Sequence, residues 1–285
     1  MTIKGKAKRS DRSRARLLNL SGTVVLVIIT AIVIFPVYWM VVSALQGGSR
    51  FETPTLLPTD LTFEAISTVV AKRPVLVWFA NSAIVSLSTA AICSALALNA
   101  GYALARYQTR SSNIFGLSIL FTQMLPATLL IVPLFVIMRE LAIVDSLGAL
   151  IVANTAFALP LSIWLMRGFV ESLPPDLEEQ AMVDGCSRFM AYLRITVPLL
   201  KPGVVVVVVF SFLLAWNDYF FARSLIFTSK KWVMSVGLTS FQTEYSVEWP
   251  EMMAAAAIFA FPAVLFFALV QRHLVSGLTA GSVKG

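Results

Sequence analysis

The sequence predicts an all-α integral membrane protein with six transmembrane helices, on three observations. Of the 285 residues, 58% are hydrophobic and only 13% are charged, whereas a soluble domain is nearer half apolar and a quarter charged. The charged residues are spaced so that long uncharged gaps remain, close to the roughly 20 residues that a helix needs to cross a bilayer. These gaps are apolar throughout, without the alternation of barrel strands. This composition argues against a soluble enzyme and against a disordered chain.

The uncharged gaps place the helices along the chain. They are residues 17–49, 74–105, 111–138, 146–166, 202–217 and 252–271. The fifth gap is short, but apolar residues continue past Asp218. The run 232–243 is too short and too polar for a seventh span, so we expect a loop there. We expect another loop, with a short surface helix, in the outer segment 46–73.

Basic residues set the predicted orientation. Seven Lys and Arg lie within residues 1–16, and such clusters stay in the cytoplasm. Six spans then put both termini in the cytoplasm, with 15 of the 22 Lys and Arg on that side and 7 outside. A cleaved signal peptide is the alternative for the N-terminus, but the first apolar run is longer than a signal peptide's apolar region.

The cytoplasmic loop 167–201 is predicted to be a helix, a glycine turn and a second helix. Pro174 and Pro175 suit a helix start, Gly185 suits its end and Ser187 can cap the next helix. The first turn is acidic, which the helix dipole favours; the acids are Asp176, Glu178 and Glu179. Two interpretations stay open, an ordinary interfacial loop and a docking element for a soluble partner.

The same loop carries a motif. Glu179-Gln180-Ala181 is followed after three residues by Gly185, and nine residues later by Ile195-Thr196-Val197-Pro198. This resembles the EAA loop of ABC importer permeases, with intact spacing and two mild departures, at Gln180 and Val197. Further matches extend over nearly the whole chain, at residues 81–82, 101–106, 123–126, 216–219 and 277–285. Together they are similar to the carbohydrate-uptake class, and within it to the MalG-type permease subunit of the maltose importer.

The resemblance implies partners and a location. Such a permease pairs with a second, related permease subunit, and the family favours a different chain in that role. Two cytoplasmic ATPase subunits dock on the EAA loops, and an extracytoplasmic sugar-binding protein delivers the sugar. The assembly lies in a bacterial or archaeal cell inner membrane. ATP binding would switch the spans between inward-open and outward-open states.

The resemblance also divides the chain into segments. They are a basic cytoplasmic tail (1–16), the first transmembrane helix (17–45), an extracytoplasmic loop (46–73), the permease core (74–275) with its EAA loop (167–201) and outer loop (223–250), and a cytoplasmic C-terminal tail (276–285).

There are three groups of candidate site residues, the first and third from the resemblance and the second from polar and aromatic residues within the predicted spans. The group for coupling to the ATPase is Glu178, Glu179, Ala181, Asp184, Gly185, Ile195 and Pro198. The group for the substrate path is Gln123, Asn154, Trp216, Asn217, Asp218 and Tyr219. The group for contact with the binding protein is Phe241, Gln242, Glu244, Tyr245 and Trp249.

Some of these residues have a plainer interpretation. Polar groups within a span usually face a cavity or a neighbouring helix. Asp218 is either a charge near the outer end of its span that reaches water, or part of the sugar path or of the helix packing that gates it. Asn81, at the start of the second span, is expected to cap that helix.

The remaining alternatives concern function. The chain has no Gly-x-x-x-x-Gly-Lys-Ser/Thr phosphate loop, so we expect no ATP hydrolysis by it and no cofactor in it; ATP and Mg²⁺ belong to the partner ATPase. We expect no catalytic residue and no metal site, since the single histidine lacks a ligand set. A permease for a polyol or glycerol phosphate is the main alternative. An ion-coupled secondary transporter would show internal repeats, and a membrane enzyme would need a catalytic cluster.

Overall fold

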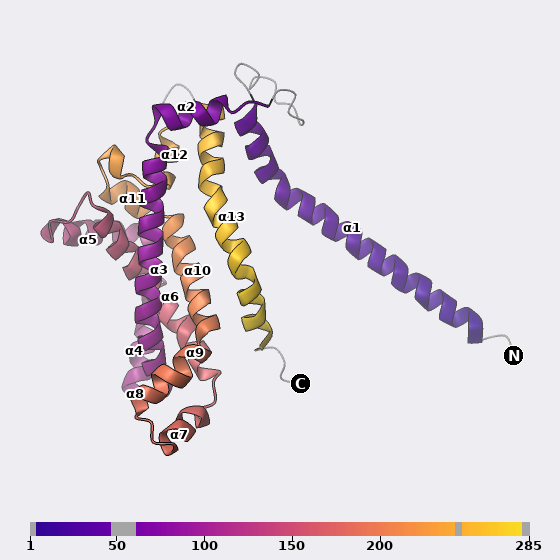
Figure 1. Cartoon of the computed structure of the whole chain (residues 1–285), viewed down its shortest axis with the longest axis vertical. Coiled ribbons are helices and arrows are strands. Elements are labelled where there is room, and N and C mark those ends of the chain that lie inside the picture. The colour runs from indigo at the N-terminus through magenta and orange to yellow at the C-terminus, as the bar shows by residue number, and fades with distance from the viewer. Residues whose placement is uncertain (1–3, 47–60, 243–246, 281–285) are drawn as a thin grey trace. The chain divides into compact units, whose positions relative to one another are not determined.

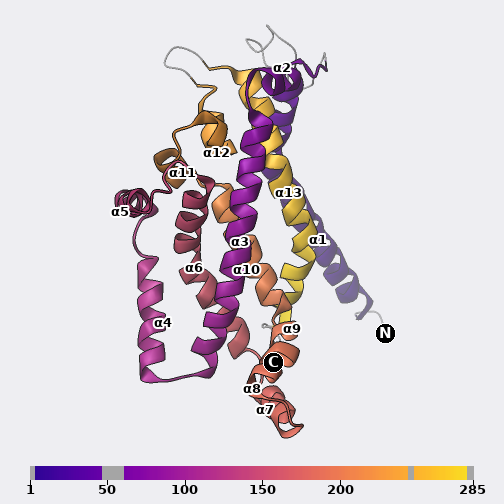
Figure 2. The same cartoon turned by 60° about the vertical axis from the view of Figure 1, so that its left-hand side comes forward.

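The computed structural model describes residues 4–46, 61–242 and 247–280, and these are almost entirely helical (Figures 1 and 2). The chain divides into two units, residues 1–69 with 248–257, and residues 70–247 with 258–285. The long helices are α1 (Lys4–Leu45), α3 (Val75–Arg106), α4 (Arg110–Thr122), α5 (Ala127–Glu140), α6 (Leu147–Glu171), α10 (Lys201–Trp216) and α13 (Trp249–Ala280). The short ones are α2 (Glu64–Lys72), α7 (Asp176–Val183), α8 (Arg188–Ala191), α9 (Val197–Leu199), α11 (Phe220–Leu225) and α12 (Met234–Thr239), with a π-helix at Tyr192–Thr196 and a 3₁₀ turn at Ser229–Lys231.

Within the described residues, four helices are long and apolar enough to cross a membrane. They are Gly22–Leu45 of α1, α3, α6 and Trp249–Phe266 of α13. Two bent helix pairs raise the number to six if each pair is one span. The all-helical membrane fold is therefore confirmed, with four to six candidate spans at the predicted places.

The second unit is built around α3. This helix packs along α6 and α10, and the three run side by side in both views (Figures 1 and 2). Small residues allow the close approach: a Cβ at Gly101 would lie 2.9 Å from the backbone nitrogen of Arg167 on α6. A buried cluster around Cys93, Ala97, Ala158 and Val207 fills the contact among the three helices. Close helix approach through small residues is the usual way that helices associate in a membrane.

The predicted single span 111–138 is wrong in one respect, because it is two helices. α4 and α5 meet at an angle of 100°. Pro126 precedes α5; it lacks a backbone N–H and disfavours helical geometry in the residue before it. Gln123, which follows α4, donates from Nε2 to the carbonyl oxygen of Phe157 on α6 at 2.8 Å. The bend is thus set by the proline and tied to α6.

The expected loop 232–243 also needs correction, because α12 lies within it. No side chain of its own caps this helix. The backbone N–H of Met234 in its first turn instead donates to Ser82 Oγ of α3 at 2.8 Å. The helix begins on a partner far away in the sequence, so local residue patterns do not reveal it. The expected short helix in segment 46–73 is present as α2.

The fifth predicted span is longer and bent. Residues Arg188–Leu199 and α10 form a pair with a bend of 68°. The bend falls at Leu200 and Lys201, directly before Pro202. Past α10, the chain turns at Asn217 and Asp218 and then forms α11.

Candidate functional site

The 167–201 loop folds as predicted, into a helix, a glycine turn and a second helix. Pro175 immediately precedes α7. The turn after α7 contains Gly185 with φ of +91°, a conformation that a side chain makes costly. Ser187 caps α8, its Oγ accepting from the backbone N–H of Met190 at 3.3 Å. The loop is therefore made of helical segments and is not an irregular connector.

Glu178 of α7 joins the loop to the end of α3. Its side chain is buried. Oε1 accepts from Arg106 Nε at 2.9 Å and from Thr196 Oγ1 at 2.9 Å, and Oε2 accepts from Tyr102 Oη at 2.8 Å. Arg106 also donates to the carbonyl oxygen of Leu173, at 3.3 Å. A carboxylate with three donors, one of them cationic, is well compensated for leaving water.

The second half of the loop is attached to the same face of α3. Tyr192, in the π-helix, donates from Oη to Asn99 Oδ1 at 3.1 Å. Its ring lies 4.5 Å from that of Tyr102, centroid to centroid. Spacings of three and four residues put side chains on one helix face. We call these six residues the clasp: Asn99, Tyr102 and Arg106 of α3 with Glu178, Tyr192 and Thr196 of the loop.

The environment of Glu178 keeps it ionised. Burial by itself raises the pKa of the carboxyl. Hydrogen bonds from Tyr102, Thr196 and Arg106, together with the Arg106 charge, outweigh burial and lower the pKa of Glu178 below its ordinary value. The clasp therefore holds a charged pair at neutral pH.

The opposite side of α7 is open. Val183 is 88% exposed and Phe189 of α8 is 67% exposed. Between them, a Cβ at Gly185 would meet no atom within 4 Å. We call Val183, Gly185 and Phe189 the tip of the loop. The apolar side chains of Val183 and Phe189 and the backbone of Gly185 are thus left largely uncovered by the described part of the chain.

The structure places the predicted coupling residues in two environments. Glu179, Asp184 and Pro198 are exposed, and Ala181 and Ile195 are half-buried. Glu178 alone of the group lies in the clasp, where its carboxylate is engaged within this chain. Beside it lies a cleft of about 180 Å³, lined by Tyr102, Arg106, Tyr107, Pro175, Glu178, Glu179, Met182 and Arg188.

Three of the predicted substrate-path residues take part in helix packing. Asn154, fully buried on α6, donates from Nδ2 to Asp218 Oδ2 at 3.2 Å. The Asp218 carboxylate also accepts the backbone N–H groups of Phe221 and Ala222 at the start of α11. Gln123 bonds to α6 at the bend described above. Asp218 thus caps α11 and ties it to α6.

The other three lie nearby with different exposure. Trp216 is buried, its ring stacked with Phe212 at 5.4 Å and Phe259 at 5.2 Å. Asn217 is exposed and donates to its own helix, and Tyr219 is half-buried. Asn154 Oδ1 and Trp216 Nε1 are buried polar atoms without a hydrogen-bond partner among the described residues.

The predicted contact residues for a binding protein are also divided. Phe241 is fully buried, with the Arg73 guanidinium 5.4 Å from its ring centroid. Gln242 is exposed and forms an isolated bridge with Val247, and Trp249 is 44% exposed. Glu244 and Tyr245 lie outside the described residues. Phe241 is therefore a core residue in this structure.

Asp145 is an anchoring residue that no sequence pattern predicts. It lies in the turn between α5 and α6 with φ of +57°. Its carboxylate accepts from Thr228, from the backbone N–H of Phe227 and from Lys231 Nζ at 3.1 Å. Hydrogen bonds from Thr228, with those of Phe227 and Lys231, hold the pKa of Asp145 well below its usual range. A lone acid in a short turn carries no local signal for partners more than 80 residues away.

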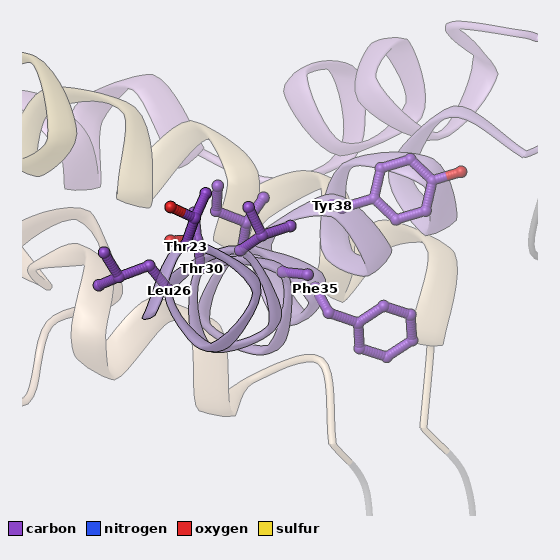
Figure 3. A pocket seen from close by; sticks show the side chains of 8 residues that line it. Thr23, Leu26, Thr30, Phe35 and Tyr38 are labelled. Atoms are coloured by element: carbon purple, nitrogen blue, oxygen red, sulfur yellow. The ribbon is translucent and has the colours of Figure 1, made fainter. Parts of the chain in front are cut away.

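A shallow apolar hollow lies along α1 (Figure 3). Its lining residues are Thr23, Leu26, Val27, Thr30, Ala31, Ile34, Phe35 and Tyr38. All of them come from one helix, so the hollow is a face of that helix and not an enclosed binding site. In a bilayer such a face meets lipid tails or a neighbouring helix.

Comparison with known proteins identifies the family of this chain. Residues 96–280 match the family described as binding-protein-dependent transport system inner membrane component. The diacetylchitobiose uptake system permease protein DasC of Streptomyces coelicolor is 36% identical over 254 residues, which cover 88% of this chain and 92% of the relative. The trehalose transport system permease protein SugB of Mycobacterium tuberculosis is 32% identical over 254 residues, covering 88% and 93%.

A solved structure agrees in fold. It is a bacterial ABC transporter involved in the import of the acidic polysaccharide alginate, with a TM-score of 0.79 and 22% identity, covering 90% of this chain and 96% of that chain. The family match extends over most of the chain and includes α6, the clasp and the whole 167–201 loop. The chain therefore belongs to the family of binding-protein-dependent transport system inner membrane components.

Proposed function

We propose that this chain is the permease subunit of an ABC importer that takes up a di- or oligosaccharide. The observation that carries the proposal is the construction of the 167–201 loop. One side of it is held by the buried Glu178–Arg106 pair to the end of a candidate span, and the other presents the uncovered tip. A loop that receives force from a soluble partner needs both features.

The tip is the proposed docking site for a partner ATPase on the cytoplasmic side of the cell inner membrane. Val183 and Phe189 supply apolar surface, and Gly185 lets the partner approach the backbone. Glu179, exposed on the same helix, is proposed to contact polar groups of the ATPase. ATP and Mg²⁺ bind to that partner, and two copies of it serve this chain and a second permease subunit.

Sugar as the substrate class is supported by the relatives. The permeases DasC and SugB are named for diacetylchitobiose and trehalose, and a sulfoquinovosyl glycerol permease of Agrobacterium fabrum is 32% identical. Within this chain, Asn154 Oδ1 and Trp216 Nε1 are proposed to serve the path, because they are buried polar atoms able to bond a hydroxyl when the helices separate.

An extracytoplasmic binding protein is proposed to touch the segment that follows Phe241. A solved alginate transporter was captured with a pentasaccharide-bound periplasmic protein. Here Gln242 and Trp249 are exposed, and Glu244 and Tyr245 belong to the same stretch. Deleting residues 242–244 spares the buried Phe241 and should impair sugar uptake more than assembly. Unchanged uptake would contradict this contact.

The proposal is tested by copurification followed by an ATPase assay. A second permease and an ATPase should come down with this chain, and sugar-loaded binding protein should stimulate the ATPase. The panel contains trehalose, diacetylchitobiose, maltose, a polyol and glycerol phosphate. Stimulation by the polyol or glycerol phosphate alone would replace the sugar assignment, and absence of a copurifying ATPase would remove the docking assignment.

A further inference from the structure

α3 is built as a straight connection between its two ends. Among the candidate spans in the described ranges, it is the one with neither a proline nor a break. α1, α6 and α13 contain Pro36, Pro160 and Pro262, and the other two spans are bent pairs. Kinks in long helices arise mostly at prolines and at breaks in the hydrogen-bond ladder. The 32 residues of α3 thus form a rod of about 48 Å at 1.5 Å per residue.

The C-terminal end of this rod carries the clasp. Its N-terminal end is attached, in a similar manner, to the segment that includes the 3₁₀ turn and α12. Trp78 Nε1 donates to the carbonyl oxygen of Ser229 at 2.7 Å. Asn81 Nδ2 donates to the carbonyl oxygens of Lys230 and Trp232, at 3.0 and 2.9 Å.

Ser82 completes this attachment by accepting the backbone N–H of Met234. We call Trp78, Asn81 and Ser82, with their partners in 229–234, the far-end contact. The expected capping role of Asn81 is wrong, because α3 begins at Val75 and Asn81 lies within it. Its amide is used for tertiary bonds.

The far-end contact is tightly packed and continues into α12. A Cβ at Gly237 would clash with the Trp78 ring, so α12 lies directly on that ring. The Trp78 and Trp232 rings are 5.8 Å apart. In both views α12 lies beside one end of α3, and α7 and α8 lie at the other (Figures 1 and 2). The segment 229–241 is therefore fixed to the end of α3 farthest from the clasp.

We propose that Asn81 and Ser82 are positioning residues that transmit loop movement, through α3, to the segment 229–241. The clasp imposes a displacement of the loop on one end of the rod, and the far-end contact passes it to α12 and to the residues that lead into 242–249. Binding at one end then affects the other reciprocally, as coupling between sites requires. This inference rests on the proposed docking of an ATPase at the tip.

The test is hydrogen–deuterium exchange on the purified complex in lipid nanodiscs, with and without a non-hydrolysable ATP analogue and Mg²⁺. Peptides covering 176–196 report the loop, and peptides covering 229–241 report the far segment. In the wild type, nucleotide should change exchange in both. In Asn81→Ala and Ser82→Ala, it should change the loop peptides and no longer change the far ones.

Ser86→Ala is the matched control. Ser86 lies on the same helix and is as buried as Ser82, but among the described residues its hydroxyl bonds only to carbonyl oxygens of α3 itself, at Ser82 and Ala83. It should keep both responses. The loop response also shows that each variant is folded and assembled.

The outcomes separate the two proposals. If the loop responds but the far segment does not in the wild type, or if it responds equally in Asn81→Ala and Ser82→Ala, transmission through the far-end contact is refuted and ATPase docking stands. If the loop itself does not respond to nucleotide, the docking assignment fails and this inference fails with it.

Discussion

Glu178 Oε1 lies 2.9 Å from Arg106 Nε, and this ion pair joins α7 to the last turn of α3 with both side chains largely shielded from water. Most ion pairs at a protein surface contribute little. This one is different because breaking a shielded pair leaves an uncompensated charge. We therefore expect this pair to contribute more than the other clasp contacts to the position of the loop.

Neutralising Glu178 should detach the loop while neutralising its neighbour should not. Glu178→Gln keeps the size of the side chain and removes the charge. The free energy that holds the loop against α3 should fall by about 3 kcal/mol. Glu179→Gln, one residue further on the exposed side, is the matched control for attachment. Hydrogen exchange of residues 176–196 measures the difference. Equal protection in both variants would show that the pair does not hold the loop.

The loop attachment should depend on pH in a defined direction. The pKa of Glu178 is lowered from its ordinary value of 4.5, so the folded state favours the charged form. Its stabilising contribution is present above 4.5 and is lost as the pH falls through the folded pKa, below 4.5. Exchange of the loop amides, corrected for intrinsic rates, should rise there in the wild type. Glu178→Gln should lack this step, and a step of equal size in it would point to another group.

Substitutions of Gly185 should uncouple transport through the backbone. Its φ of +91° costs a residue with a side chain about 1–2 kcal/mol, and a β-branched residue most. We expect Gly185→Val to lose sugar uptake and Gly185→Asn to retain more than Gly185→Val. Gly168→Ala is the control, since that glycine also has open space around it but no positive φ. Normal uptake by Gly185→Val with its ATPase bound would contradict the docking assignment.

A methyl group at Gly101 should weaken the packing of α3 on α6. The added Cβ would lie 2.9 Å from the Arg167 backbone nitrogen and 2.9 Å from Met166 Cβ, and backbone atoms cannot rotate away. Gly101→Ala should cost about 1–3 kcal/mol, as overpacking does. At Gly148, the nearest atom would be 3.5 Å away, so Gly148→Ala serves as the control. Thermal unfolding of the purified complex compares the two.

The spacing of charged residues, together with proline, glycine and serine at the ends of helices, predicted much of this fold. The charge-free gaps located the spans because a bilayer imposes length and apolarity on each helix. Pro175, Gly185 and Ser187 predicted the shape of the 167–201 loop because each acts within a few residues of itself.

What could not be predicted depends on partners distant in the sequence. Glu178 and Glu179 are adjacent acids, and only the packing of α7 against α3 decides which one is buried. Similarly, α12 begins on Ser82, and Asp145 binds residues from the turn after α11. Asn81 fits a helix start by its type, yet its amide serves the segment at 230–232.

The bend between α4 and α5 has a consequence for how the chain enters the membrane. At 13 and 14 residues, the two helices are each about 20 Å long at 1.5 Å per residue, against a hydrocarbon layer of about 30 Å. Neither half can cross the bilayer alone, so we expect the two helices to partition poorly into lipid as separate segments. We therefore expect their stable insertion to depend on α6, whose carbonyl at Phe157 accepts a hydrogen bond from the Gln123 amide.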